Sequence, residues 1–129
     1  MKYLQEYIEE AQTKAFNKAG AFFAFSDKQF DEQKKEGVEY VSMYAGLICP
    51  KENTDTLHTE LENIYKAGIE QDIAENGREA IVKRELNNHE AYYTGDTTST
   101  IEALSEYKTI TPEDINHIFR NKNYIIAHE

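Results

Sequence analysis

The side chains with the greatest capacity for chemistry in this sequence are four histidines and one cysteine: His58, His89, His117, His128 and Cys49. No two of them lie within four residues of each other, so the H-x-x-x-H and C-x-x-C spacings of common zinc sites do not occur. We therefore expect no bound metal and no cofactor. A single cysteine also precludes an internal disulfide, so we expect Cys49 to be a small buried apolar residue. A nucleophilic pair of Cys49 with His89 stays open as an alternative.

A denser group of reactive types lies in residues 88–96, NHEAYYTGD. If the protein is a small enzyme or ligand-binding domain, this segment predicts its site, with His89, Glu90 and Asp96 around the ligand. The competing interpretation is a helix end that its own polar residues cap. Tyr92 and Tyr93 are adjacent, so a helix cannot bury both equally, and we expect one of them to face solvent as an apolar anchor for a partner.

Motifs of established catalytic chemistry do not occur. The sequence contains no G-x-x-x-x-G-K or G-x-G-x-x-G phosphate loop and no G-x-S-x-G nucleophile elbow. We assign no catalytic residue and favour a function without catalysis.

Charge favours a protein partner. The net charge of −10 disfavours binding to duplex nucleic acid or anionic membranes, since both attract Lys and Arg. Residues 52–77 and 85–114 carry the acidity, and such acidic faces attract a basic or nucleic-acid-binding protein. Solubility alone and mimicry of nucleic acid are the alternatives. The candidate acidic contacts, expected on the solvent side of a long helix, are Glu60, Glu62, Glu70 and Asp72.

Between the acidic segments lies a short basic cluster, formed by Arg78, Lys83 and Arg84. These side chains spread around a helix, so we expect ion pairs with the neighbouring acidic helices rather than a nucleic-acid site. The N-terminus has no apolar stretch that resembles a signal peptide or a membrane span, which favours a cytoplasmic location.

The first half of the chain alternates between helical and strand-like patterns. Apolar spacing predicts a helix over 3–19, and aromatic or β-branched runs predict strands at 21–25 and 38–49 that pair antiparallel. A helix over 27–35 is expected between them, capped by Ser26 with Gln29 and stapled by Phe25 against Phe30. Ala45-Gly46 predicts a bulge or bend within the second strand.

The second half reads as mainly helical. We expect helices over 54–76, 78–91 and 100–107, and another that begins at Pro112 behind a Thr111 cap. Gly68 lies on the apolar face of the first of these, which predicts close packing against another helix. Residues 123–127 are expected to add a terminal strand. The prediction is a single α+β domain over 1–129, with about five helices and a small two- or three-stranded antiparallel sheet.

Three stretches resemble one family of small proteins from Bacteroidota and their bacteriophages, a domain of unknown function. They are GAFFAFSDKQFDEQKKEG at 20–37, YAGLICPKEN at 44–53 and GIEQDIAENGREAIVKRELNNHEAYYTGD at 68–96. The resemblance covers roughly residues 15–120. It implies an intracellular bacterial or viral setting, in which small acidic proteins often bind a host protein, as anti-CRISPR and other anti-defence inhibitors do.

Two hypotheses follow from the sequence. The first is a protein that binds a partner, with an inhibitor of a host defence system as its most specific form. The second is a small enzyme or ligand-binding domain of phage nucleotide or nucleic-acid metabolism, with its site around His89. A deep pocket at that residue would favour the second hypothesis.

Overall fold

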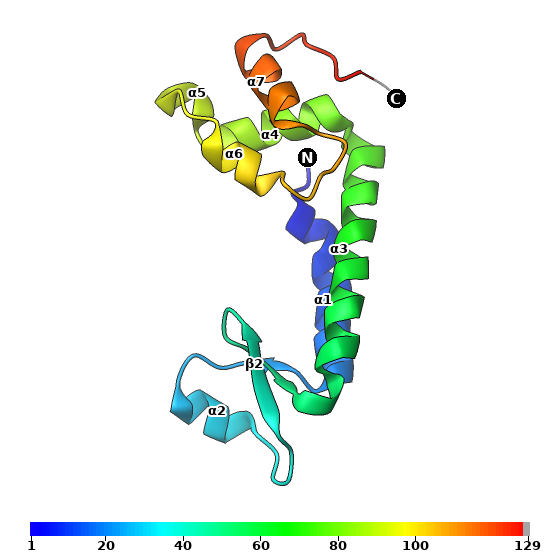
Figure 1. Cartoon of the computed structure of the whole chain (residues 1–129), viewed down its shortest axis with the longest axis vertical. Coiled ribbons are helices and arrows are strands. Elements are labelled where there is room, and N and C mark those ends of the chain that lie inside the picture. The colour runs from blue at the N-terminus through cyan, green and yellow to red at the C-terminus, as the bar shows by residue number, and fades with distance from the viewer. Residues whose placement is uncertain (128–129) are drawn as a thin grey trace. The chain divides into compact units, whose positions relative to one another are not determined.

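A computed structural model describes residues 1–127 of the chain (Figure 1). Residues 2–127 form two compact units, which we call the N-terminal unit (residues 2–68) and the C-terminal unit (residues 69–127). The expected fold class is confirmed, because the structure has an open three-stranded antiparallel sheet and five helices of seven residues or more. That the whole chain is one domain stays a prediction.

The N-terminal unit holds the sheet. Its elements are α1 (Leu4–Ala19), β1 (Phe22–Phe23), α2 (Asp27–Gln33), β2 (Tyr40–Tyr44), β3 (Leu47–Pro50), the 3-10 turn η1 (Lys51–Asn53) and most of α3 (Thr54–Asn76). The C-terminal unit takes the end of α3 and the shorter helices α4 (Arg78–Asn88), α5 (Ala91–Thr94), α6 (Thr98–Ala103) and α7 (Pro112–Arg120). No helix of residues 1–127 combines the length and the apolarity that crossing a membrane requires.

The sheet differs from the expected pair of strands in one respect. Ala45 and Gly46 both have positive φ angles, 49° and 80°, which makes a tight hairpin turn rather than a bend within one strand. The predicted strand 38–49 is therefore two strands, and the order in the sheet is β1-β3-β2. Only β3 pairs with β1, with Phe22 opposite Ile48.

One face of β3 supplies the core of the N-terminal unit. Leu47 and Cys49 are buried against Ala15 of α1 and Leu57 and Leu61 of α3. The expected burial of Cys49 is confirmed, since its exposed fraction is 0%. Because the thiol is sealed in this core, the structure gives it no access to a substrate.

Close packing at Gly68 is also confirmed. A Cβ atom at this position would lie 2.3 Å from Cγ2 of Ile8, which is far inside van der Waals contact. Figure 1 shows α1 running alongside α3 in the N-terminal unit. The missing side chain of Gly68 therefore lets the two helices approach each other.

The expected helix caps are present. The Ser26 hydroxyl accepts a hydrogen bond from the Gln29 N–H at 3.2 Å, and the Thr111 hydroxyl accepts one from the Asp114 N–H at 3.0 Å. The expected staple differs, because the Phe30 ring contacts Phe22 and Tyr40 instead. Phe25, its expected partner, stacks on Phe23 and is 74% exposed.

The end of the chain departs from the sequence prediction. Residues 123–127 are irregular, so the expected terminal strand is wrong. The Ile126 side chain is buried, and its N–H donates to the Glu79 carboxylate at 3.2 Å. A side chain of α4 therefore satisfies the backbone group that a strand partner would have satisfied.

Candidate functional site

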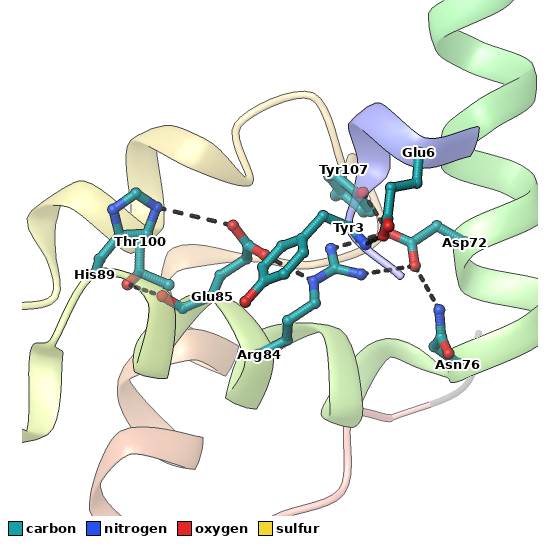
Figure 2. A network of polar contacts seen from close by, with 9 residues as sticks. All are labelled: Tyr3, Glu6, Asp72, Asn76, Arg84, Glu85, His89, Thr100 and Tyr107. Carbon is teal, nitrogen blue, oxygen red and sulfur yellow. Dashed lines mark hydrogen bonds and ion pairs between the residues drawn. The ribbon is translucent and has the colours of Figure 1, made fainter. Parts of the chain in front are cut away.

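A buried cluster of polar side chains in the C-terminal unit is centred on Arg84 of α4 (Figure 2). Its guanidinium donates to both oxygens of the Asp72 carboxylate, Nη1 to Oδ1 at 2.9 Å and Nη2 to Oδ2 at 3.0 Å. The same group donates through Nε to Glu85 Oε2 at 2.7 Å. Arg84 therefore bridges the end of α3 to the middle of α4 with charge-assisted bonds.

Two further donors complete the shell of Asp72. The Tyr107 hydroxyl donates to Oδ2 at 2.5 Å, and the Asn76 amide donates to Oδ1 at 2.8 Å. Each carboxylate oxygen thus accepts two hydrogen bonds, and the exposed fraction of Asp72 is 0%. A carboxylate whose lone pairs are filled in this way has none left for a metal ion or a substrate proton. We interpret this cluster as structural.

The same contacts shift the acidity of the buried groups. Burial raises the pKa of the Asp72 carboxyl, but the hydrogen bonds from Arg84, Tyr107 and Asn76 outweigh it and leave that pKa below its usual range. Burial raises the pKa of the Tyr107 hydroxyl, and its bond to the Asp72 carboxylate raises that pKa further. Asp72 is therefore held ionised and Tyr107 held neutral.

His89 lies at the outer end of this cluster. Its Nε2 is 3.8 Å from Glu85 Oε1, one helical turn earlier, and its side chain is 30% exposed. The Thr100 hydroxyl donates to the backbone oxygen of Glu85 at 3.3 Å. Figure 2 draws these residues, and it also draws Tyr3 and Glu6, which bond to each other at the start of α1.

The other two residues of the expected ligand site, Glu90 and Asp96, are exposed. Asp96 accepts a hydrogen bond from the Thr98 N–H at 2.9 Å, and this bonding lowers its pKa. This bond agrees with the interpretation of residues 88–96 as a helix end that is capped by its own polar residues.

Among residues 1–127, no three His, Cys, Asp or Glu side chains gather as metal ligands, and His128 lies outside the described residues.

The expectation for Asp72 was wrong. It was predicted on the solvent side of the long helix, as a contact for a partner, but it is buried in an ion pair. Position 72 follows Ile69 by three residues, which puts it on the apolar stripe of α3. A carboxylate on such a stripe signals a buried pair, and the expected ion pairing of Arg84 with an acidic helix is confirmed.

The remaining acidic candidates do lie at the surface. Glu60 is bonded to Lys18 at 3.0 Å, and Glu62 is paired with His58 at 3.0 Å. Glu70 is exposed on the last part of α3. Glu60 and Glu62 belong to the N-terminal unit, whereas Glu70 belongs to the C-terminal unit.

Tyr92 and Tyr93 lie on the short helix α5, which has a residue in the left-handed conformation at each end. The expected helix over 78–91 ends at Asn88, and α5 follows between Glu90 and Gly95, which both adopt left-handed conformations. Because of this break, Tyr93 does not continue the buried face that Val82 and Leu86 form on α4. The Tyr93 side chain is 92% exposed, the largest exposed fraction among the described large apolar residues.

The Tyr92 ring, unlike that of Tyr93, packs against α7. It stacks on Phe119 of α7 with centroids 5.3 Å apart, and Lys122 Nζ lies 4.9 Å from the Tyr92 ring. Burial raises the pKa of the Tyr92 hydroxyl. Tyr92 remains 39% exposed, so both tyrosines present aromatic surface to solvent. The Tyr92 ring is held by its packing on Phe119, and the Tyr93 ring extends into solvent. We call Tyr92, Tyr93 and Lys122 the tyrosine surface.

Sequence reasoning missed Tyr107, Thr100 and Glu85 as buried polar residues. Tyr107 follows Leu104 by three residues, which is a weak sign of a shared buried side. Thr100 and Glu85 carry no comparable sign in the sequence.

The structure also contains a hollow of about 90 Å³ between the end of α1 and the start of α3, and Lys18, Asn53 and Glu60 line part of it. It is far smaller than the ~300–1,000 Å³ of typical ligand sites.

In a comparison with protein families, residues 4–124 match a family described as "Family of unknown function (DUF7659)". The match includes the three stretches that carry the resemblance. No curated protein and no solved structure matches the chain.

Proposed function

Because the chain belongs to the family of unknown function DUF7659, whose description names no activity, we propose its function from its surface. The protein binds a protein partner, and the tyrosine surface is the centre of the contact. The observation that carries the proposal is the 92% exposure of Tyr93 on a short, braced helix.

The energetic argument concerns what an exposed aromatic ring gains on binding. Tyrosine offers a large contact area at a low cost in side-chain entropy, and it is enriched among residues that dominate binding energy. Tyr92 is already stacked on Phe119, so little of its freedom remains to be lost. Tyr93 stands beside it with nearly its whole side chain available to a partner.

Acidic residues complement this anchor and favour a partner with a basic surface. Glu90 and Asp96 flank α5 in the sequence, and both are exposed. Glu70 adds an exposed carboxylate in the same unit. Charges at the rim of an interface act mainly on the association rate and on partner choice.

The more specific form of the proposal follows from the resemblance of the three stretches. We propose that the protein comes from a phage or mobile element of Bacteroidota, acts in the host cytoplasm and inhibits a host defence effector. A basic nucleic-acid-binding effector suits the charge of −10. The alternative of a small enzyme around His89 gains a single supporting contact, the approach of His89 to Glu85.

The test is an affinity pull-down from a lysate of the organism that encodes the protein, with quantitative mass spectrometry. Wild-type chain, Tyr93→Ala and the control Ile125→Ala serve as baits; Ile125 is another exposed apolar residue of the C-terminal unit, 70% exposed. We expect a protein that the wild type and the control enrich at least tenfold more than Tyr93→Ala does. Equal enrichment by all three baits, or no enriched protein, would overturn the proposal.

A further inference from the structure

We propose that a second copy of this chain pairs with the outer edge of β2, so that two sheets join antiparallel into one. In the strand order β1-β3-β2, this strand has β3 on one side and no described strand on the other. An edge strand presents a row of unpaired N–H and C=O groups, which another strand can satisfy.

The hydrogen-bond pattern shows which backbone groups are available. The Lys51 N–H donates to the Glu39 oxygen at 2.9 Å, so positions 39 and 51 form a hydrogen-bonded pair. Such pairs alternate along an antiparallel ladder, and the next one joins Val41 to Cys49. The N–H and C=O groups of Tyr40 and Ser42 therefore point away from β3, toward the open edge.

The composition of the sheet explains why a second copy is the fitting occupant. No charged residue occurs from Tyr40 through Pro50, or in the two residues of β1. Edge strands that avoid pairing usually carry a charge or a proline, and β2 carries neither. Two copies of net charge −10 repel each other, so they approach with least cost where the facing segments carry little charge.

The register follows from the same pattern. A two-fold axis at Val41 puts Tyr40 of one copy opposite Ser42 of the second copy, and each such pair exchanges both backbone hydrogen bonds. Val41 then faces Val41 of the second copy as a close pair without hydrogen bonds. Glu39 falls opposite Met43, so no like charges meet. This register uses the regular part of β2, before the bulge between Ser42 and Tyr44.

Exposed apolar side chains add to the backbone pairing. Val38, Val41 and Tyr44 are 38%, 39% and 50% exposed, and all three lie on or beside this strand. The contact is short, so we expect a weak dimer with a dissociation constant of roughly 100 µM. The tyrosine surface belongs to the other unit, so this inference does not depend on the proposed function.

The test is sedimentation equilibrium of the full chain from about 1 µM to about 1 mM, beside amide hydrogen exchange at both limits. We expect the mass to rise from 14.9 kDa toward twice that value, and the Tyr40 and Ser42 amides to gain protection together with it. A chain that stays monomeric at every concentration overturns the proposal. Protection of these amides that appears only after another protein is added also overturns it, because the edge would then pair with that protein instead of a second copy. A dimer whose Tyr40 and Ser42 amides exchange freely also overturns it.

Two variants test the edge itself. Val41→Lys puts like charges opposite each other at the two-fold axis, and Ser42→Pro removes an outward N–H, which an edge strand tolerates. We expect each variant to weaken dimerisation at least tenfold. The matched control is Ile125→Lys, which adds the same charge at an exposed position of the other unit, outside the tyrosine surface, and leaves dimerisation unchanged. If Ser42→Pro unfolds the chain, the test rests on Val41→Lys. Dimerisation of Val41→Lys with the wild-type dissociation constant contradicts the proposal.

Discussion

The Arg84 guanidinium forms a two-pronged ion pair with the Asp72 carboxylate across twelve positions of sequence, and both side chains are almost completely buried. One partner comes from α3 and the other from α4, so the pair fixes how these helices meet within the C-terminal unit. A buried pair of this kind stabilises little relative to an apolar core, but losing one partner leaves a charge without compensation.

Removing the cation tests this relationship. Arg84→Met leaves the buried Asp72 carboxylate without its main partner, so we expect the free energy of unfolding to fall by about 3–5 kcal/mol. The measurement is urea denaturation followed by circular dichroism. Lys14→Met is the control, because the Lys14–Glu10 pair is exposed and contributes roughly 0.5 kcal/mol or less. Equal losses in the two variants would show that Asp72 does not depend on Arg84.

The same pair predicts how stability depends on pH. The pKa of Asp72 in the folded chain is lower than its value of about 4 in an unfolded chain. Its contribution is therefore fully present above that unfolded value and is lost as the pH falls through the folded pKa. We expect the stability difference between wild type and Asp72→Asn to shrink as the pH drops from 7 to 3.

Denaturant titrations of both proteins across this range measure that difference, and the other carboxylates, which both proteins share, largely cancel. A difference that stays constant down to pH 3 would mean that Asp72 is not preferentially ionised in the fold.

Close packing of α1 on α3 gives a third prediction. Gly68→Ala places a Cβ 2.3 Å from Cγ2 of Ile8, and forcing extra volume into a packed site costs about 1–3 kcal/mol. The better helix propensity of Ala offsets about 1 kcal/mol of this cost. We expect a net destabilisation in thermal and urea unfolding.

A double-mutant cycle isolates the contact. Ile8→Ala removes the atom that Cβ would strike, so Gly68→Ala is expected to become neutral or stabilising in that background. The same cost in both backgrounds would point to a cause other than Ile8.

The helical part of the fold follows closely from the sequence, because apolar spacing and caps act locally. The bounds of α3 match the expected helix over 54–76, and the Ser26 and Thr111 caps form as predicted. The hairpin between β2 and β3 was harder to predict. Gly46 signals a break in the strand, but Ala45 adopts a positive φ angle that alanine rarely takes, and its residue type does not signal a full hairpin turn.

The candidate site was only partly predictable, for a related reason. The left-handed Glu90 ends α4 early and turns Tyr93 outward, and a glutamate at such a position is not recognisable from sequence. The burial of Asp72 was recognisable, since the residue lies on the apolar stripe of α3. Its partner Tyr107 comes from thirty-five residues away, and local patterns carry no information on such contacts.

The most direct test of the proposed function is the affinity of purified chain for the partner that the pull-down recovers, measured by calorimetry for wild type and Tyr93→Ala. Tyr93 is 92% exposed, so its truncation leaves the free energy of unfolding unchanged. If the tyrosine surface is the centre of the contact, Tyr93→Ala weakens binding by about 2 kcal/mol, or roughly thirtyfold. An affinity within twofold of the wild-type value would contradict the proposal that this surface binds the partner.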